Sequence, residues 1–193
     1  MRVIAGKYKH RHFDVPRSFK ARPTTDFAKE NLFNILQNVY VDFDDALKAL
    51  DLFAGTGSMS LEFLSRGCRK VVSVEKDHKH CQFIRRVAHE IGDEAWTVVM
   101  ADVFKYVEHC HDAFDIIFAD PPYALPDIAR LPETVMKSGL LAQGGMFILE
   151  HGKSNNFSND PRLIDQREYG SVHFSFFQNQ SVEIPRQEGL QTP

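Results

Sequence analysis

Cysteine is scarce in this 193-residue chain, and the three that occur, Cys68, Cys81 and Cys110, form no Cys-x-x-Cys pair. An odd number without paired spacing argues against a disulfide framework and against a zinc ribbon. His109 and His111 flank Cys110, but no second pair of candidate ligands lies at zinc spacing. We therefore expect no metal site.

Long hydrophobic runs are also absent, since no stretch of about 18 apolar residues could span a bilayer. The first residues lack the basic-then-apolar order of a secretory signal. An apolar content of 43% and a charged content of 25% are ordinary for a globular protein. The length is enough for one domain with a full core. These features predict a cytoplasmic monomer without membrane contacts.

Positive charge is in deficit over the whole chain, whose net charge is −3, yet it is concentrated near the N-terminus. Residues 1–25 carry a net charge of +6, which leaves −9 for the remainder. A basic segment on an acidic body is typical of phosphate contacts with a nucleic acid, and the alternative is a solubilising terminus. The basic residues are Arg2, Lys7, Lys9, Arg11, Arg17, Lys20 and Arg22.

Short apolar runs alternate with amphipathic stretches of helical length from about residue 46 onwards. This alternation predicts an α/β protein with repeated βα units, a mostly parallel sheet and an antiparallel edge hairpin. The predicted strands cover residues 46–53, 70–75, 96–101, 114–119 and 145–150, followed by the hairpin 162–168 and 171–178. The predicted helices cover residues 58–65, 77–91, 103–109 and 126–137.

A smaller unit precedes these repeats. Residues 2–5 and 12–15 flank Gly6 and predict a small β-hairpin, and Thr24 or Thr25 is placed to cap a following helix. We interpret the chain as a basic extension with a capping helix (1–40), a main domain (41–180) and a flexible tail (181–193). The predicted apolar face of the capping helix consists of Ala28, Leu32, Ile35, Leu36 and Val39.

A glycine-rich segment from Asp51 to Gly57, which includes Phe53, joins the first strand of the main domain to its helix. Gly55 and Gly57 permit a tight turn and close approach of the backbone to a ligand. Glu75 ends the next strand, the usual place for an acid that binds ribose hydroxyls. A dinucleotide is an alternative ligand, but Asp51 would face its pyrophosphate with like charge. S-adenosylmethionine carries an amino group and a sulfonium instead, so the segment favours this cofactor.

Two further acids are expected on the same rim of the sheet. Asp102 and Val103 follow the third strand, where a carboxylate and a backbone N–H can meet an adenine edge, and Asp102 is equally suited to cap the next helix. Asp120 follows the fourth strand. Together with Asp51 and Glu75, they place four acids at the carboxyl ends of strands, where open α/β sheets bind ligands.

The tetrapeptide Asp120-Pro121-Pro122-Tyr123 suits an exocyclic amino group on a nucleobase. The Asp120 carboxylate and the Pro121 carbonyl, whose direction Pro122 restricts, offer two acceptors for the two N–H bonds. Tyr123 offers a ring on which an unstacked base can lie. The alternative is a simple turn at the end of a strand.

Other aromatic residues are given structural roles. His151, just after the fifth strand, is expected to be a surface imidazole near the predicted rim, with substrate contact as the alternative. Phe174, Phe176 and Phe177 are expected to pack the edge strand rather than to stack on bases.

These segments together resemble the RsmD-type 16S ribosomal RNA guanine-N2 methyltransferases, which are class I S-adenosylmethionine-dependent enzymes. The resemblance covers residues 1 to about 178. Three departures are His10 in place of a usual glycine, and Ser60 and Phe63 in place of small residues after the glycine turn. The matching segments are 22–26, 30–34, 50–57, 64–67, 120–123 and 169–170.

The resemblance implies a Rossmann-like, seven-stranded sheet and methyl transfer to the N2 of a guanine in 16S rRNA, free or in an assembling small subunit. The alternatives are a DNA adenine-N6 or cytosine-N4 methyltransferase, and a non-catalytic RNA-binding assembly factor. We expect Lys7, Lys9, Arg11 and Arg22 to contact RNA. The implied donor contacts are Thr25, Asp51, Gly55, Gly57, Glu75 and Asp102, and the implied catalytic residues are Asp120, Pro121, Pro122 and Tyr123.

Overall fold

A computed structural model describes residues 1–19 and 25–178 of the chain. Seven strands form one sheet in the order β3-β2-β1-β4-β5-β7-β6. The first five strands are parallel, and β7 is antiparallel to both β5 and β6. The mostly parallel sheet with an antiparallel edge hairpin is therefore confirmed. The strands are β1 (Lys48–Leu52), β2 (Lys70–Glu75), β3 (Trp96–Met100), β4 (Phe114–Ala119), β5 (Leu141–His151), β6 (Leu163–Tyr169) and β7 (Val172–Gln178).

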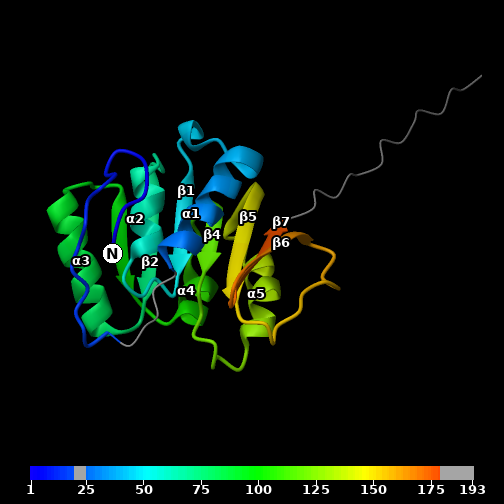
Figure 1. Cartoon of the computed structure of the whole chain (residues 1–193). Coiled ribbons are helices and arrows are strands. Elements are labelled where there is room, and N and C mark those ends of the chain that lie inside the picture. The colour runs from blue at the N-terminus through cyan, green and yellow to red at the C-terminus, as the bar shows by residue number, and fades with distance from the viewer. Residues whose placement is uncertain (20–24, 179–193) are drawn as a thin grey trace, which may run out of the picture.

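Helices cover both faces of the sheet (Figure 1). On one face, α1 (Asp26–Ile35), α2 (Ser58–Ser65) and α3 (His78–Ile91) share a core with the arm formed by residues 1–19. On the other face lie α4 (Val103–His109) and α5 (Leu131–Lys137), which is preceded by a 3₁₀ turn at Ile128–Arg130.

The parallel strands are buried on both faces, which explains their nearly continuous apolar sequences. Within β1, Ala49 packs toward the α1–α3 face and Leu50 toward the α4–α5 face. Phe174 and Phe176 join the first of these cores and Phe177 the second, so all three side chains are buried in packing as expected. Their strand, β7, lies between β5 and β6 and is not the edge strand that the sequence predicted.

Some predicted boundaries differ from the structure for local reasons. β1 begins at Lys48 because Ala46 adopts a left-handed conformation with φ of 52° at the end of the 3₁₀ turn Phe43–Asp45. β5 is longer than expected and extends from Leu141 to His151, with an irregular register against β4.

The predicted apolar face of α1 is wrong at its end. Leu32 and Leu36 are fully buried and Ile35 packs partly against the same core, but Val39 is 61% exposed. The chain changes from α-helix to a π-helical turn at Leu36–Tyr40. A wider turn rotates the following side chains away from the positions that a 3.6-residue period predicts.

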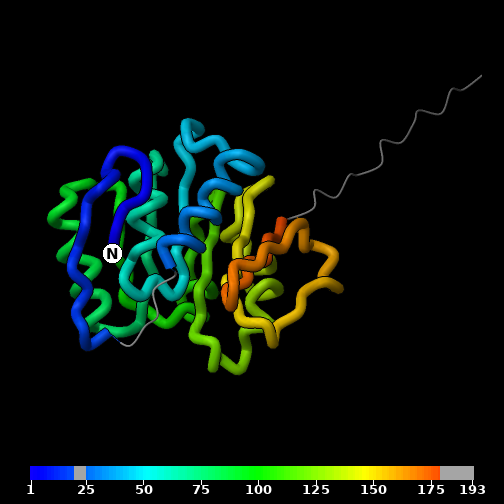
Figure 2. The backbone as a smooth tube through the Cα atoms, in the orientation of Figure 1, coloured from blue at the N-terminus to red at the C-terminus, as the bar shows by residue number. Residues whose placement is uncertain are grey.

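The β-hairpin predicted in the arm is reduced to a single isolated antiparallel bridge between Arg2 and His12. The arm then runs alongside α3 (Figure 2). The Phe19 ring lies 5.6 Å from the Phe83 ring of that helix. The predicted tail at 181–193 lies outside the described residues. Within the described ranges, no helix combines the length and apolar character needed to cross a membrane.

Candidate active site

Four acidic residues lie at the carboxyl ends of four neighbouring strands. Asp51 is in β1, Glu75 ends β2, Asp102 follows β3 and Asp120 follows β4, and these strands are adjacent in the sheet. Their common edge, which we call the rim, is where ligands bind in doubly wound sheets. The sequence predicted this arrangement because the carboxyl ends of parallel strands meet at one edge.

The turn from β1 to α2 has an unusual backbone. Phe53, Gly55 and Gly57 all have positive φ, at 62°, 54° and 74°. A Cβ added at Gly57 would lie only 3.1 Å from Ile84 and Trp96 side-chain atoms, so this position requires glycine for packing as well as for conformation. A positive φ at a residue such as Phe53 marks backbone strain, which gathers at ligand-binding sites.

Glu75 holds this turn in place. Its Oε2 accepts a hydrogen bond from Gly55 N at 2.8 Å, and its Oε1 accepts one from Asp77 N at 2.7 Å. The side chain therefore joins the β1–α2 and β2–α3 connections at the rim. A carboxylate oxygen has a second lone pair, so these bonds leave acceptor capacity for ribose hydroxyls.

Asp51 is fully buried and points into a polar network. Its Oδ2 accepts from Ser60 N at 3.0 Å and from Ser60 Oγ at 2.5 Å. Ser60 Oγ also lies 2.6 Å from Ser73 Oγ, to which Trp96 Nε1 donates at 2.8 Å. Burial raises the pKa of Asp51 to about 7, although the bonds from Ser60 oppose this shift. The sequence marked Ser60 only as a departure, yet it is the residue that anchors Asp51.

Asp102 and Thr25 both cap helices. Asp102 accepts from Phe104 N at 3.1 Å at the start of α4, and Thr25 accepts from Ala28 N at 3.2 Å at the start of α1. Asp102 is exposed and Val103 is buried. Asp102 lies at the rim because it directly follows β3, and donor binding by Asp102, Val103 and Thr25 stays a prediction.

Asp120 lies at the centre of the rim, where its backbone N–H donates to Leu52 O at 3.4 Å. Desolvation, followed by the negative charges of Glu150 and Asp51, raises the pKa of Asp120 well above its usual range. Pro121 is buried, whereas Tyr123 is 54% exposed. A raised pKa at a rim carboxyl is typical of a functional group.

The Tyr123 ring lies against the chain that leaves β5. A Cβ added at Gly152 would sit 3.6 Å from Tyr123 Cδ2, so the ring covers this backbone. Glycine at 152 thereby leaves room for the ring beside the end of β5.

His151 is buried, and its prediction as a surface imidazole is wrong. Its Nδ1 lies 2.9 Å from Gly152 O, which can only accept, so Nδ1 carries the proton. Nε2 then accepts from Ser175 Oγ at 2.8 Å, and Gln166 Nε2 donates to the same hydroxyl at 3.0 Å. Burial lowers the pKa of His151. The partners come from β6 and β7, which no spacing around His151 reveals.

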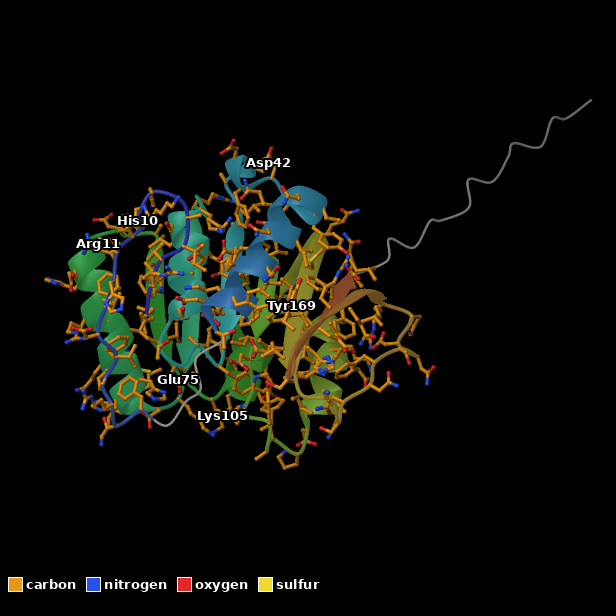
Figure 3. All side chains as sticks on the ribbon, viewed as in Figure 1. His10, Arg11, Asp42, Glu75, Lys105 and Tyr169 are labelled. Carbon is orange, nitrogen blue, oxygen red and sulfur yellow. The ribbon has the colours of Figure 1, made fainter. Side chains whose placement is uncertain are left out.

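Lys7 and Arg11 of the arm lie away from the rim. Lys7 Nζ pairs with Asp93 at 2.6 Å and Arg11 with Glu90 at 3.0 Å, both beside the C-terminal end of α3. In Figure 3, Arg11 is labelled near the upper end of α3 and Glu75 lower down, toward the rim. Lys9 is exposed, and Arg22 lies outside the described residues. Nucleic acid bound at the rim would have to extend along α3, about 21 Å for 14 residues, to reach Lys7 and Arg11.

The charge of Glu150 leads to a test by pH. If Asp120 acts as a hydrogen-bond acceptor, the rate must rise as pH increases through its pKa, because the carboxylate is the competent form. Glu150→Gln removes a like charge and lowers that pKa. The acidic limb of log kcat/KM against pH should therefore move to lower pH. Glu168→Gln, at an exposed carboxylate on β6, is the control, and equal shifts in both variants would contradict the assignment.

The sheet order and the composition of the rim define a class I methyltransferase fold. An RNA methyltransferase from Salinibacter ruber in complex with S-adenosyl-L-homocysteine shares it with a TM-score of 0.63 at 13% identity, covering 84% of this chain and 97% of that one. The chain belongs to the family described as "Conserved hypothetical protein 95", whose model matches residues 1–178. Together with the relatives described next, this match confirms the RsmD-type resemblance.

Relatives match nearly the whole chain. Ribosomal RNA small subunit methyltransferase D of Escherichia coli K12 is 29% identical over 185 residues, covering 94% of this chain and 91% of the relative. The protein of the same name from Buchnera aphidicola is 24% identical over 183 residues, covering 93% and 92%. The structure of a hypothetical protein from Thermus thermophilus has a TM-score of 0.80 at 29% identity, covering 92% and 99%. In the described parts of the chain, no group of three or more His, Cys, Asp or Glu residues is placed to hold a metal ion.

Proposed function

We propose that this protein transfers a methyl group from S-adenosylmethionine to the exocyclic N2 of a guanine in 16S ribosomal RNA. The observation that carries the proposal is the Asp120–Tyr123 segment at the end of β4, directly beside the glycine turn that ends β1. The family and the names of its relatives support rRNA of the small subunit as the substrate.

The residues of the rim fit S-adenosylmethionine chemically. The backbone of Gly55 and Gly57 offers close approach, Glu75 suits the ribose hydroxyls, and Asp102 with Val103 suits the adenine edge. Asp51, whose pKa is about 7, would be held as a carboxylate by a nearby ammonium group. When bound, S-adenosylmethionine supplies a methyl group on a positively charged sulfur.

The acceptor side is formed by Asp120, Pro121 and Tyr123. A target guanine extruded from its stack would lie on the Tyr123 ring. Its amino group would donate one N–H to Asp120 and the other to the Pro121 carbonyl, which directs the nitrogen lone pair toward the donor. The proton released from N2 passes to Asp120 or to solvent.

Labelling tests this proposal directly. The protein is incubated with S-adenosylmethionine labelled in its methyl group and with small subunits from cells that lack this protein. We expect label in 16S rRNA, and nucleoside analysis should give N2-methylguanosine rather than N6-methyladenosine or N4-methylcytidine. Donor binding by calorimetry without label in any nucleic acid would refute the proposal and favour a non-catalytic factor.

Tyr123 provides a test of base placement. Tyr123→Ala should raise KM for RNA and lower kcat/KM by about 5- to 150-fold, since stacking on an aromatic side chain contributes about 1–3 kcal/mol per base. Tyr123→Phe should stay within about threefold of wild type, because stacking needs the ring and not the hydroxyl. Equal losses in the two variants, measured by steady-state labelling, would assign the effect to the hydroxyl instead.

The arm provides a test by salt. If Lys7, Lys9 and Arg11 contact phosphates, replacing all three with Gln should flatten the slope of log affinity against log salt by about 0.7 to 0.9 per lost contact. Donor affinity should stay unchanged, because these residues lie at the edge opposite the glycine turn. This measurement needs an RNA long enough to span α3. An oligonucleotide of four nucleotides is the control, because it cannot reach from the rim to the C-terminal end of α3. An unchanged slope with the long RNA would indicate that the arm is a solvated terminus that does not contact RNA.

A further inference from the structure

Two aromatic side chains meet on the surface beside α1. Phe27, in the first turn of α1, is 66% exposed and belongs to no buried cluster. Its ring centroid lies 6.0 Å from that of Tyr169, with an interplanar angle of 84°. An edge-to-face pair leaves the face of one ring open for a further stacking partner. Tyr169 itself rests on Phe174 of the core, which fixes its position.

This pair lies at the rim. Because β7 is antiparallel to β5, His173 near the start of β7 pairs with His151 at the end of β5. The turn that joins Tyr169 to β7 is therefore at the carboxyl end of β5, beside the Tyr123 connection (Figure 3 labels Tyr169). The first turn of α1 also reaches the glycine turn, since Lys29 Nζ donates to Ser58 Oγ at 3.1 Å.

The pair is on the acceptor side of the site. Apart from Thr25, which caps α1, the predicted donor residues lie in or directly after β1, β2 and β3, whereas Tyr169 belongs to the hairpin that follows β5 in the sheet order. Asp120, after β4, lies between the two groups. A ligand on Phe27 and Tyr169 would thus adjoin the target base rather than the methyl donor.

Two arginines flank the aromatic pair. Arg2 Nε pairs with Asp26 at 3.1 Å, next to Phe27 in sequence, and both side chains are about half exposed. Arg167 Nε pairs with Asp165 at 2.8 Å and projects from the same face of β6 as Tyr169, two residues along. The exposed Arg2–Asp26 pair is weak, so a phosphate can replace Asp26 as the partner of Arg2. Asp165 is only 18% exposed and also accepts from Tyr40 Oη at 2.8 Å, so Arg167 would contact a phosphate through N–H groups other than Nε.

We propose that Phe27 and Tyr169 form a stacking site for an unpaired nucleotide base next to the target base, with Arg2 and Arg167 contacting its phosphates. Aromatic faces combined with arginines are the chemistry by which single-stranded RNA is held. The identity of the RNA rests on the proposed function, but the stacking itself does not depend on methyl transfer.

Binding of a single-stranded 12-nucleotide RNA with a central 2-aminopurine tests the site without any donor. We expect Phe27→Leu to weaken binding by roughly tenfold and to reduce the quenching of 2-aminopurine, and Phe27→Trp to retain both. Val39→Ala is the matched control, because Val39 is a similarly exposed apolar side chain at the end of the same helical segment. Wild-type affinity in Phe27→Leu would overturn the inference, and so would weaker binding with unchanged quenching.

The two proposals can fail separately. If wild-type protein labels no RNA but Phe27→Leu still loses 12-mer binding, the stacking site stands and the proposed methylation falls. If labelling succeeds and Phe27→Leu has wild-type affinity and KM, the stacking site alone falls. If Phe27→Leu loses activity only on assembled subunits and binds free RNA as wild type does, this surface contacts a ribosomal protein instead of RNA, which would also overturn the inference.

Discussion

Asp120→Ala should lower kcat by about 100- to 10,000-fold while donor affinity changes by less than about threefold. In the proposed reaction the carboxylate accepts a hydrogen bond from the reacting amine, and this interaction strengthens as the nitrogen lone pair is directed toward the methyl group. The residues proposed to bind the donor lie in or after β1, β2 and β3 and at the start of α1, so the substitution leaves them intact. Single-turnover labelling and calorimetry measure the two quantities.

The same strand offers a matched control. Asp112 precedes β4 as Asp120 follows it, and it is exposed and paired with Lys70 at 2.6 Å. Asp112→Ala should therefore leave both turnover and donor affinity unchanged. A fall in donor affinity as large as the fall in rate for Asp120→Ala would make Asp120 a donor ligand instead. The Asp120→Ala variant should fold normally, since removing the desolvated Asp120 carboxyl near Glu150 relieves like-charge repulsion.

The central sheet could be predicted well because its physical signals are local. β2 and β4 occur at their predicted bounds, since each is a short apolar run between polar turns. α2 and α4 also match, because a glycine and an aspartate cap define their starts. The meeting of Asp51, Glu75 and Asp120 then follows from parallel strands without any further information.

Features that depend on tertiary contacts could not be predicted. Val39 is exposed because of a π-helical turn that the spacing of apolar residues does not encode. His151 is buried because Ser175 and Gln166 arrive from other strands to satisfy it. The path of the arm, which takes Lys7 away from the rim, follows from hydrogen bonds to α2 and to the turn after α3 that are distant in sequence.

The strongest of these long-range anchors is Glu62 of α2, whose side chain is fully buried. It accepts hydrogen bonds from Ile4 N at 2.9 Å, from Ala5 N at 3.0 Å and from Arg66 Nε at 3.0 Å. Lys29 Nζ lies 3.7 Å away and is also buried. Glu62 thus joins the arm, α1 and the helix that begins at the glycine turn.

Glu62→Ala should cost about 3–5 kcal/mol of the free energy of unfolding, because it leaves the buried Lys29 charge without its counter-ion and two partly buried backbone N–H groups without their acceptor. Glu133→Ala is the control, since Glu133 pairs with Lys137 one helical turn away at an exposed position and should cost less than about 1 kcal/mol. Urea unfolding followed by circular dichroism measures both. Equal midpoints for Glu62→Ala and wild type would contradict the role of Glu62.

The pH dependence of that loss identifies its cause. Burial lowers the pKa of Lys29 from its ordinary value of 10.5, so the unfolded chain binds more protons than the folded one between the two pKa values. Stability therefore rises with pH in that window. Without Glu62 the pKa of Lys29 falls further and the window widens. The variant should therefore regain part of its lost stability as the pH rises toward 10.5. A loss that is constant over this range would assign the cost to the Ile4 and Ala5 amides rather than to the buried charge.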